Sequence, residues 1–382
     1  MTDTTEAGFT DEHVRRARTF HRPLYTLYVV RQALALTVLA LLAFSELGVR
    51  LFGELDELGW PAAGLAMPAM VVGILALVGL PFSYWRGFVH EHRFGLSTQT
   101  RTAWFVDWVK GLIVSLAITV ITLFGLVVLA RELDGWWPAV AAPVAFVLVI
   151  LLTFIGPVVT EPLFNRFEPL EDNELANDLR ALSAQAGVPV RQVLVADASR
   201  RTRRQNAYVS GLNKTRRVVL YDTLVDTSPP GNVRLVTAHE LAHQREHHVA
   251  IGSLLGATSA AAFVLLLWAL LSSAAVLDAI GASGAADPRI APFVLLVGRM
   301  VGLVTLPFGS WLSRRWERVA DRISLELTSD LASFESVHRE LALSNLADLE
   351  PPTTFYSLTF SHPTAPERII AARQTAVGLA SS

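Results

Sequence analysis

Two histidines with a glutamate between them are the part of this sequence whose chemistry can be read first. His239 and His243 stand four residues apart in His-Glu-Leu-Ala-His. On a helix, both rings lie on one face and can bind one metal ion together. Glu240 is then rotated by about 100° from His239, beside the open side of the metal, where its carboxylate can take a proton from water. The pattern predicts a zinc hydrolase; for five residues alone, a solvated helix that carries two histidines is the alternative.

Composition restricts what can hold such a metal. Hydrophobic residues make up 52% of the 382 residues and charged residues 17%, with a mean hydropathy of +0.42. These values indicate several membrane spans. Cysteine is absent, so any metal must be held by histidine, aspartate or glutamate, and a thiolate nucleophile is excluded. A formal net charge of -2 gives no indication of a nucleic-acid partner.

Six apolar segments are long enough to cross a hydrocarbon core of about 30 Å. They cover approximately residues 29–48, 62–84, 103–130, 138–160, 249–275 and 291–312. Arginines gather before the first segment, in the loop 85–102, after the fourth segment and after the sixth, whereas most of the opposite loops are acidic or neutral. The positive-inside rule therefore predicts a multi-pass membrane protein with both termini and the His239 region facing the cytoplasm.

The segments divide the chain into five expected parts. They are an N-terminal arm (1–28), four spans (29–160), a first catalytic part (161–248), two further spans (249–312) and a second catalytic part (313–382). Within the first catalytic part, the pattern predicts a helix and three strands. The helix covers 173–186, two β-rich runs cover 193–196 and 217–221, and an edge strand covers 206–209.

A third metal ligand is expected just after the sixth span. Nothing stops the histidine helix before the fifth span, so His243 lies about 9 Å from its start, and Glu317 lies about 8 Å past the end of the sixth. A tight hairpin of these two spans would return Glu317 to the level of the histidines and leave a fourth position for water. Asp321, one turn later, could accept the second ring proton of a ligating histidine. Ion pairs with neighbouring arginines are the alternative for both acids.

Other polar residues have weaker claims. His247 competes for the third ligand position, but three ligands spread over two turns of one helix converge poorly on one ion. His90 and His92 are expected to be structural, and Arg200 to Arg204 to form an exposed turn. Arg299 lies deep in the sixth span, where a charge costs on the order of 2.5–3.5 kcal/mol. It indicates either a protein-lined or watery interior or a structural pair with an acidic residue.

Several short motifs follow one another in order along most of the chain. They are Phe88-Val-His-Glu91-His-Arg-Phe94-Gly95-Leu, Asp107 to Lys110, Glu161-Pro-Leu-Phe-Asn165-Arg-Phe167-Glu-Pro-Leu170-Glu-Asp, Asn206-Ala207-Tyr208, His239 to His243, Glu317 to Asp321, and Ser361-His362-Pro363 with Glu367-Arg368. In this series the chain resembles the type I CAAX prenyl endopeptidases, which are integral-membrane zinc metalloproteases, and more distantly the heat-shock membrane proteases.

The resemblance implies a mainly α membrane protein of about six transmembrane helices with a discontinuous α+β, gluzincin-like domain on the cytoplasmic side. It implies that the two helix histidines and Glu317 bind Zn2+, that Glu240 is the general base and that His362 stabilises the oxyanion. The strand Asn206-Ala207-Tyr208 would line the substrate, and Arg368 would support the site or bind substrate. The implied partner is a peptide or lipidated protein, cut near its C-terminus beside membrane lipid. Family members often have an additional N-terminal span, whereas six spans are expected here.

Two other functions stay open at this point. A quality-control metalloprotease of broader specificity would share the same site. A transporter or channel with a structural metal belongs to a different class, and Arg299, Lys110 and Asp107 prompt it because they place charge within or beside apolar spans. The variant Glu240→Gln separates the classes, since a protease should then keep its zinc and lose hydrolysis.

Overall fold

Six long helices carry the six apolar segments. The computed structural model describes residues 4–171, 173–211 and 216–380. The long helices are α1 (Asp11–Phe44), α3 (Trp60–Tyr84), α5 (Arg101–Leu133), α6 (Trp137–Phe164), α10 (His248–Leu271) and α12 (Ala291–Thr328). By length and composition, five continuous helical runs could cross a membrane, and the longest, Arg101–Phe164, joins α5 and α6 through the turn η2 (Asp134–Trp136). The number of membrane crossings stays a prediction.

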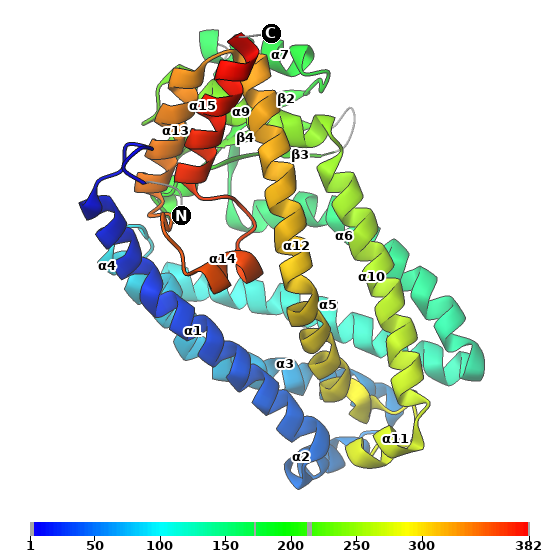
Figure 1. Cartoon of the computed structure of the whole chain (residues 1–382). Helices are drawn as coiled ribbons and strands as arrows, with labels where there is room; N and C mark the ends of the chain where they lie inside the picture. Colours follow the sequence, from blue (N-terminus) through cyan, green and yellow to red (C-terminus); the bar gives the residue numbers. More distant parts are fainter. Residues whose placement is uncertain (1–3, 172, 212–215, 381–382) are drawn as a thin grey trace.

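Short elements connect the long helices. At the end distant from the sheet lie α2 (Glu46–Asp56) and α11 (Ala274–Ile280), followed by the turn η5 (Pro288–Ile290) (Figure 1). The π-helical turn η1 (Trp85–His90) and α4 (Glu91–Arg93) follow α3 and lead to α5. The predicted tight hairpin of the fifth and sixth spans is wrong, because α11 separates them and α10 packs mainly along α6. Even so, α12 brings Glu317 back to the histidine pair.

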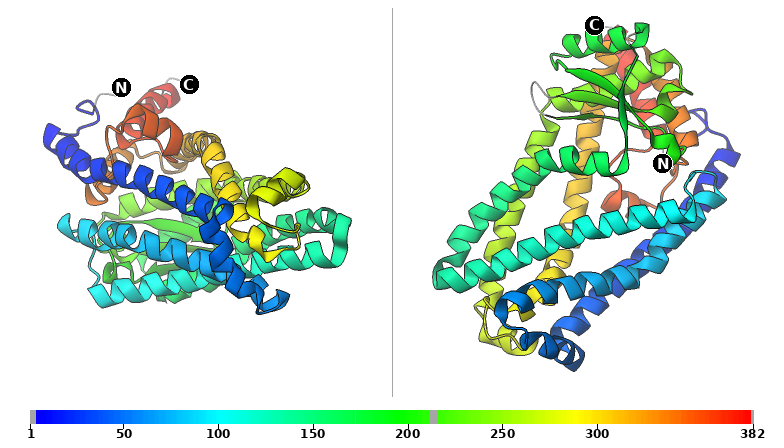
Figure 2. Two further views of the ribbon diagram at one scale, coloured as in Figure 1. Left: turned by 90° about the horizontal axis from the view of Figure 1, so that it is seen from below. Right: turned by 180° about the vertical axis from the view of Figure 1, so that it is seen from behind.

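A four-stranded mixed sheet forms the centre of the α/β part. Its strands are β1 (Phe167–Pro169), β2 (Gln192–Ala196), β3 (Ala207–Ser210) and β4 (Arg217–Tyr221), in the spatial order β1-β2-β4-β3. β2 and β4 are parallel, and the two outer strands run antiparallel to their neighbours. The sheet lies at one end of the long helices (Figure 2). The predicted strands 193–196 and 217–221 are confirmed, and β3 lies at an edge, as the prediction for 206–209 required.

Helices cover one face of this sheet and close the core. α7 (Glu174–Gln185), α8 (Asp222–Val225) and α9 (Pro230–Arg245) contact the strands, and α13 (Leu331–Ser344) and α15 (Ala365–Ala380) pack outside them against α9 and α12. The turn η3 (Ala198–Arg200) precedes β3, and the short helix α14 (Thr353–Thr359) packs on α12. Alternate residues of β4 point to opposite faces, so Val218 and Leu220 enter the core with Leu179 and Leu235, whereas Val219 faces the other side. Burying each such leucine contributes about 1.5–3 kcal/mol. This packing fixes the rotation of α9 and therefore the direction of its histidines.

The N-terminal arm packs against the second catalytic part. Phe9 and Ala17 are buried with Leu349 and Ile369, so the start of α1 is held beside α15. The start of α1 and the end of α15 lie at the same end of the molecule as the sheet (Figure 1). The N-terminal arm and the C-terminal helix, which lie near opposite ends of the sequence, thus pack together.

Ion pairs join the α/β part to the long helices. Arg201 Nε lies 2.7 Å from Asp107 Oδ2, at the start of α5, and Arg204 Nη2 lies 2.9 Å from Glu91 Oε1. The prediction of an exposed turn over Arg200 to Arg204 is therefore wrong for these two arginines, since their carboxylate partners come from distant segments. Within the apolar bundle, Arg299 donates to the side chain of Gln32 on α1, so its partner is a neutral amide and not an acidic residue.

Candidate metal centre

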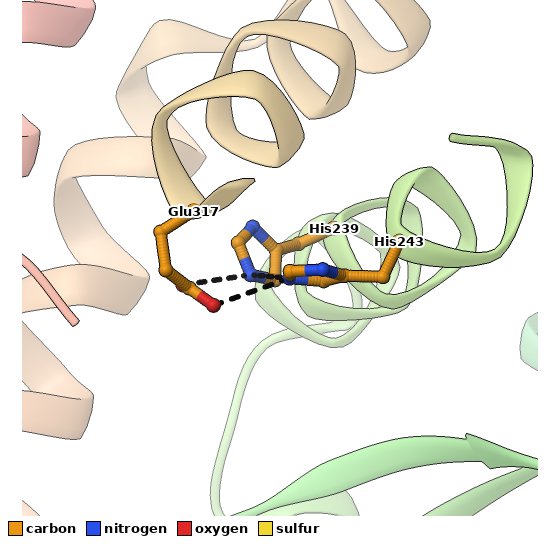
Figure 3. A group of neighbouring side chains, drawn as sticks. All are labelled: His239, His243 and Glu317. Atoms are coloured by element: carbon orange, nitrogen blue, oxygen red, sulfur yellow. Dashed lines mark hydrogen bonds and ion pairs between the residues drawn. The ribbon is translucent and has the colours of Figure 1, made fainter. Parts of the chain in front are cut away.

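Two helices from distant parts of the sequence meet at the metal centre. α9 begins at Pro230, a residue whose fixed φ suits the first turn of a helix. α12 has 38 residues, so it is about 57 Å long and continues well beyond its apolar half. The rings of His239 and His243 on α9 face Glu317 on this continuation, as Figure 3 shows. Glu317 is only 4% exposed, which places a carboxylate in a buried position beside two imidazoles.

The three predicted ligands fit a zinc ion. Nε2 of His239 lies 3.3 Å from Oε2 of Glu317, Nε2 of His243 lies 3.2 Å from Oε1, and the two Nε2 atoms are 3.2 Å apart. A tetrahedral zinc ion with bonds of about 2.0–2.1 Å holds its ligand atoms about 3.3 Å from one another. Oε2 of Glu317 is buried and accepts no hydrogen bond among the described residues, which leaves it available to a metal. Both the distances between the ligand atoms and the free oxygen of Glu317 therefore fit a zinc ion at this place.

Asp321 and Arg368 support His239 from the side opposite Glu317. Oδ1 of Asp321 lies 3.0 Å from Nδ1 of His239, so this carboxylate can hold the ring in the tautomer that frees Nε2. Arg368 donates through Nε to Oδ2 of Asp321 at 2.9 Å and through Nη2 to Oδ1. Its Nη2 lies 3.7 Å from Glu317. Of the two roles considered for Arg368, this geometry favours support of the site over direct substrate binding.

His338 on α13 closes the buried side of this group, and no motif or spacing in the sequence points to it. Its Nε2 lies 4.0 Å from Oδ1 of Asp321, while Nδ1 donates to the Phe334 carbonyl at 2.8 Å. Burial lowers the pKa of His338 to about 3, because the imidazolium would lose its hydration. The ring of His338 is therefore neutral and forms no ion pair with Asp321, so the Asp321 carboxylate stays available to His239 and Arg368.

His248 provides the matching support for His243. The Nδ1 atoms of the two rings are 3.0 Å apart, and the ring of His248 stacks on Trp316 with centroids separated by 4.9 Å. His247, by contrast, has a left-handed backbone with φ of 56° and separates α9 from α10. The prediction that the histidine helix runs unbroken toward the fifth span is therefore wrong. This break turns His248 toward the metal centre.

Glu240 lies one residue beyond His239, with its side chain partly exposed. Desolvation raises the pKa of the Glu240 carboxyl group above its ordinary value, since the carboxylate is less well hydrated there than in water. A raised pKa makes the carboxylate a stronger base, so it accepts a proton from water more readily, and the protonated group is still a far stronger acid than the amine that leaves. These are the properties of a group that acts as base and then as acid.

His362 approaches the centre from the loop between α14 and α15. Its Nε2 lies 3.4 Å from Oε1 of Glu317, and Ser361 Oγ lies 2.8 Å from its Nδ1. The side chain of His362 is 59% exposed, so neighbouring side chains do little to hold it. The structure thus places His362 near Glu317, which lies 45 residues earlier in the chain, and its role in stabilising an oxyanion stays a prediction.

The predicted substrate strand lies beside α9. Ala207 and Tyr208 belong to β3, and Asn206 precedes them and accepts a hydrogen bond from Tyr221 N at 3.0 Å. Glu161 at the end of α6 braces this edge, because it accepts from Ser210 Oγ at 3.1 Å and from Arg217 Nη2 at 2.9 Å. The resemblance included Glu161 within a motif without giving it a role. The geometry assigns it to the support of β3.

Comparison with known proteins agrees with this site and fold. The model of peptidase family M48 matches residues 169–376, and the model of the CAAX prenyl protease N-terminal region, five membrane helices, matches residues 3–166. CAAX prenyl protease 1 of Saccharomyces cerevisiae (strain ATCC 204508 / S288c) is 30% identical over 328 residues, which cover 81% of this chain and 72% of the yeast protein. The uncharacterized metalloprotease YhfN of Bacillus subtilis (strain 168) is 29% identical over 299 residues, covering 78% of this chain and 70% of that protein.

A solved structure has the same fold. The crystal structure of S. mikatae Ste24p superposes with a TM-score of 0.82 at 24% sequence identity, and the match covers 97% of this chain and 91% of that chain. The metalloprotease family model covers more than half of the chain and includes both helices of the metal centre. This chain therefore belongs to peptidase family M48, as an integral-membrane zinc metalloendopeptidase similar to the CAAX prenyl proteases.

Proposed function

We propose that this enzyme cleaves peptide bonds near the C-terminus of lipidated or very apolar proteins, including prenylated CAAX proteins, at the cytoplasmic face of the membrane. One observation carries the proposal: β3, an edge strand of the described sheet, lies beside a His-His-Glu centre, and α12, which carries Glu317, continues into the apolar helices. Such an arrangement suits an extended peptide whose anchor stays in the membrane.

His239, His243 and Glu317 would hold the zinc ion. When bound, zinc supplies a Lewis acid that polarises the substrate carbonyl and lowers the pKa of water toward neutrality. Glu240 would take a proton from the attacking water and pass it to the leaving amine. Its raised pKa favours the first step, and the second step is favourable because an amine is a far stronger base than a carboxylate.

His362 would stabilise the negative charge that develops on the carbonyl oxygen. A Ser361 hydroxyl that donates to Nδ1 leaves the ring proton on Nε2, the nitrogen that faces Glu317. A donor in that place is worth roughly 3–4 kcal/mol in other hydrolases. Arg368 holds Asp321 and, through it, the orientation of His239.

The substrate would pair with the free edge of β3. An extended peptide can add to a sheet edge through main-chain hydrogen bonds, so binding needs little side-chain specificity. Asn206, Ala207 and Tyr208 would line this added strand. The positive-inside rule supports a cytoplasmic orientation, since the arginine-rich parts, the start of α1 and the end of α15 lie at the same end as the metal centre.

The test uses purified, zinc-loaded enzyme and matched C-terminal peptides that differ only in a prenyl group. We expect faster cleavage of the prenylated peptide, with the cut mapped near the C-terminus by mass spectrometry. Equal cleavage of both peptides would contradict the lipid preference and favour the broader quality-control protease. Glu240→Gln is the negative control for contaminating proteases, and hydrolysis that persists in this variant would remove Glu240 from its proposed role.

A further inference from the structure

A buried arginine on α12 has no carboxylate partner among the described residues. Arg314 is 7% exposed and lies one turn before Glu317. Its partners are main-chain carbonyls: Nη1 donates to Tyr356 O at 3.0 Å and to Phe360 O at 2.5 Å, and Nη2 donates to Ser357 O at 3.4 Å. The guanidinium also lies over the Tyr356 ring, 4.9 Å from its centroid. All the hydrogen bonds of this buried guanidinium therefore go to main-chain carbonyls of one short segment, Tyr356 to Phe360.

That segment is the last turn of α14 together with Phe360, the residue that follows it. The final carbonyls of a helix have no partner within it and carry partial negative charge. Ser310, one turn before Arg314 on α12, donates to Leu358 O at 3.1 Å, so two α12 side chains cap α14 from outside. Hydrogen bonds from a charged donor are about twice as strong as neutral ones. Arg314 is therefore the main tie between α12 and the end of α14.

The hydrogen bonds from Arg314 also restrain His362, because His362 follows Phe360 by two residues. The far end of the same loop is held by Glu367, which accepts from Tyr356 Oη at 2.5 Å and from Thr364 N at 2.9 Å. Because the His362 ring is exposed, its place near Glu317 depends on the backbone that carries it. Arg314 and Glu317 lie on successive turns of one helix, so a single rigid element sets both the metal carboxylate and the loop that presents His362 to it.

We propose that Arg314 is a positioning residue for catalysis: it caps α14 in trans and so fixes the distance of His362 from the metal centre. It touches neither metal nor substrate. This inference rests on the proposed role of His362. It predicts that Arg314 contributes to kcat through His362 and leaves zinc binding unchanged.

The test measures kcat, KM and zinc stoichiometry for Arg314→Ala, Arg314→Lys, His362→Ala and the double variant Arg314→Ala/His362→Ala. We expect Arg314→Ala to lower kcat about 10- to 100-fold, the loss that a displacement of about 1 Å can cause, with KM and zinc content near those of the wild type. The double variant should be no slower than His362→Ala. Lysine should recover only part of the loss, because an ammonium cannot reach three carbonyls in the planar geometry of a guanidinium.

Arg315→Ala is the matched control, since its side chain is exposed one residue away, and it should keep the wild-type kcat. If Arg314→Ala does not fold, Ser310→Ala removes one of the same caps more gently and should lower kcat in the same non-additive way. Additive losses, an unchanged kcat or loss of zinc would each overturn the inference. A His362→Ala variant with wild-type kcat would instead overturn the proposed role of His362, which keeps the two failures distinguishable.

Discussion

Asp321 touches the ring nitrogen of His239 that faces away from Glu317, with 3.0 Å between Oδ1 and Nδ1. A carboxylate in this position fixes the histidine tautomer and makes the other nitrogen a better metal ligand. Arg368 holds the same carboxylate through Nε at 2.9 Å. The orientation of His239, a proposed zinc ligand, therefore depends on Asp321 and Arg368.

We expect Asp321→Asn to weaken zinc binding by about 10- to 100-fold, because the amide carries no charge to orient His239 or to neutralise Arg368. Competition with a chromophoric chelator measures this affinity on the purified protein. Glu326→Gln is the matched control, since its carboxylate is exposed on the same helix and pairs with Arg322 at 3.8 Å. Equal zinc affinities in the two variants would contradict the supporting role of Asp321.

His248 should matter for zinc, and its neighbour His247 should not. The Nδ1 atoms of His248 and His243 are 3.0 Å apart, so a neutral His248 can accept the second ring proton of His243. We expect His248→Ala to lower zinc affinity by about tenfold or more, with partial recovery in His248→Gln, whose amide oxygen can also accept. His247→Asn is the control, because asparagine tolerates the left-handed backbone at this position. A larger effect at 247 than at 248 would reverse the assignment.

Glu240→Gln should separate metal binding from chemistry. The amide cannot take a proton from water, so we expect kcat to fall about 100- to 10,000-fold while the zinc stoichiometry stays that of the wild type. Atomic absorption and peptide cleavage on one preparation give both values. Treating the wild type with a chelator should abolish cleavage, and added zinc should restore it in the wild type but not in the variant. Parallel loss of zinc and activity in Glu240→Gln would show a ligand role in place of a proton-transfer role.

Local spacing was enough to predict the histidine pair, because residues four apart on any helix share a face. Glu317 was also predictable, although the tight hairpin behind that prediction is wrong, because α12 continues past its apolar half to the level of the histidines. The predicted helix over 173–186 corresponds to α7 (Glu174–Gln185), and both predicted core strands were found. In each case the signal lies within a few residues of sequence or in the length of a span.

The features that the sequence did not reveal depend on distant partners. The partners of Arg201 and Arg204 are Asp107 and Glu91, about a hundred residues earlier, so their own neighbourhood read as an exposed turn. No glycine or proline stands at the helix break at His247, so the local sequence does not predict it. The left-handed backbone of this histidine depends on tertiary packing. Arg314 stands in a run of charges that resembles a solvated helix face, and its carbonyl partners lie more than 40 residues away.

Glu161 should affect substrate binding more than turnover. Its carboxylate braces β3 through Ser210 and β4 through Arg217, whereas the metal ligands lie on other elements. We expect Glu161→Ala to raise KM about five- to tenfold and to leave kcat within about twofold. The reason is that a mobile edge strand loses conformational entropy when the peptide pairs with it, which weakens binding. Glu168→Gln, on the opposite edge strand β1 and exposed, is the control. A fall in kcat with unchanged KM would place Glu161 with the catalytic groups instead.

Low pH should weaken the contacts between the N-terminal arm and the second catalytic part, and so lower the stability of the fold. Glu335 on α13 accepts from Arg373 Nε at 2.7 Å and also pairs with Arg339. Arg339 donates to Ala7 O at 2.9 Å and Arg373 to Glu6 O at 2.7 Å, so one carboxylate orients both contacts to the arm. The hydrogen bond from Arg373 lowers the pKa of Glu335 below its ordinary value of 4.5.

Because the folded-state pKa is lowered, the stabilisation is fully present above about pH 4.5, the ordinary value for the unfolded chain, and is lost as pH falls through the folded-state pKa. We expect Glu335→Gln to lower the free energy of unfolding by about 1–2 kcal/mol at neutral pH. The gap between wild type and variant should close in acid, and thermal unfolding midpoints in detergent from pH 7 downward measure it. Glu326→Gln should show no such gap at any pH, since its ion pair is exposed. A Glu335→Gln gap that persists unchanged in acid would mean that packing around residue 335, and not its charge, holds the arm.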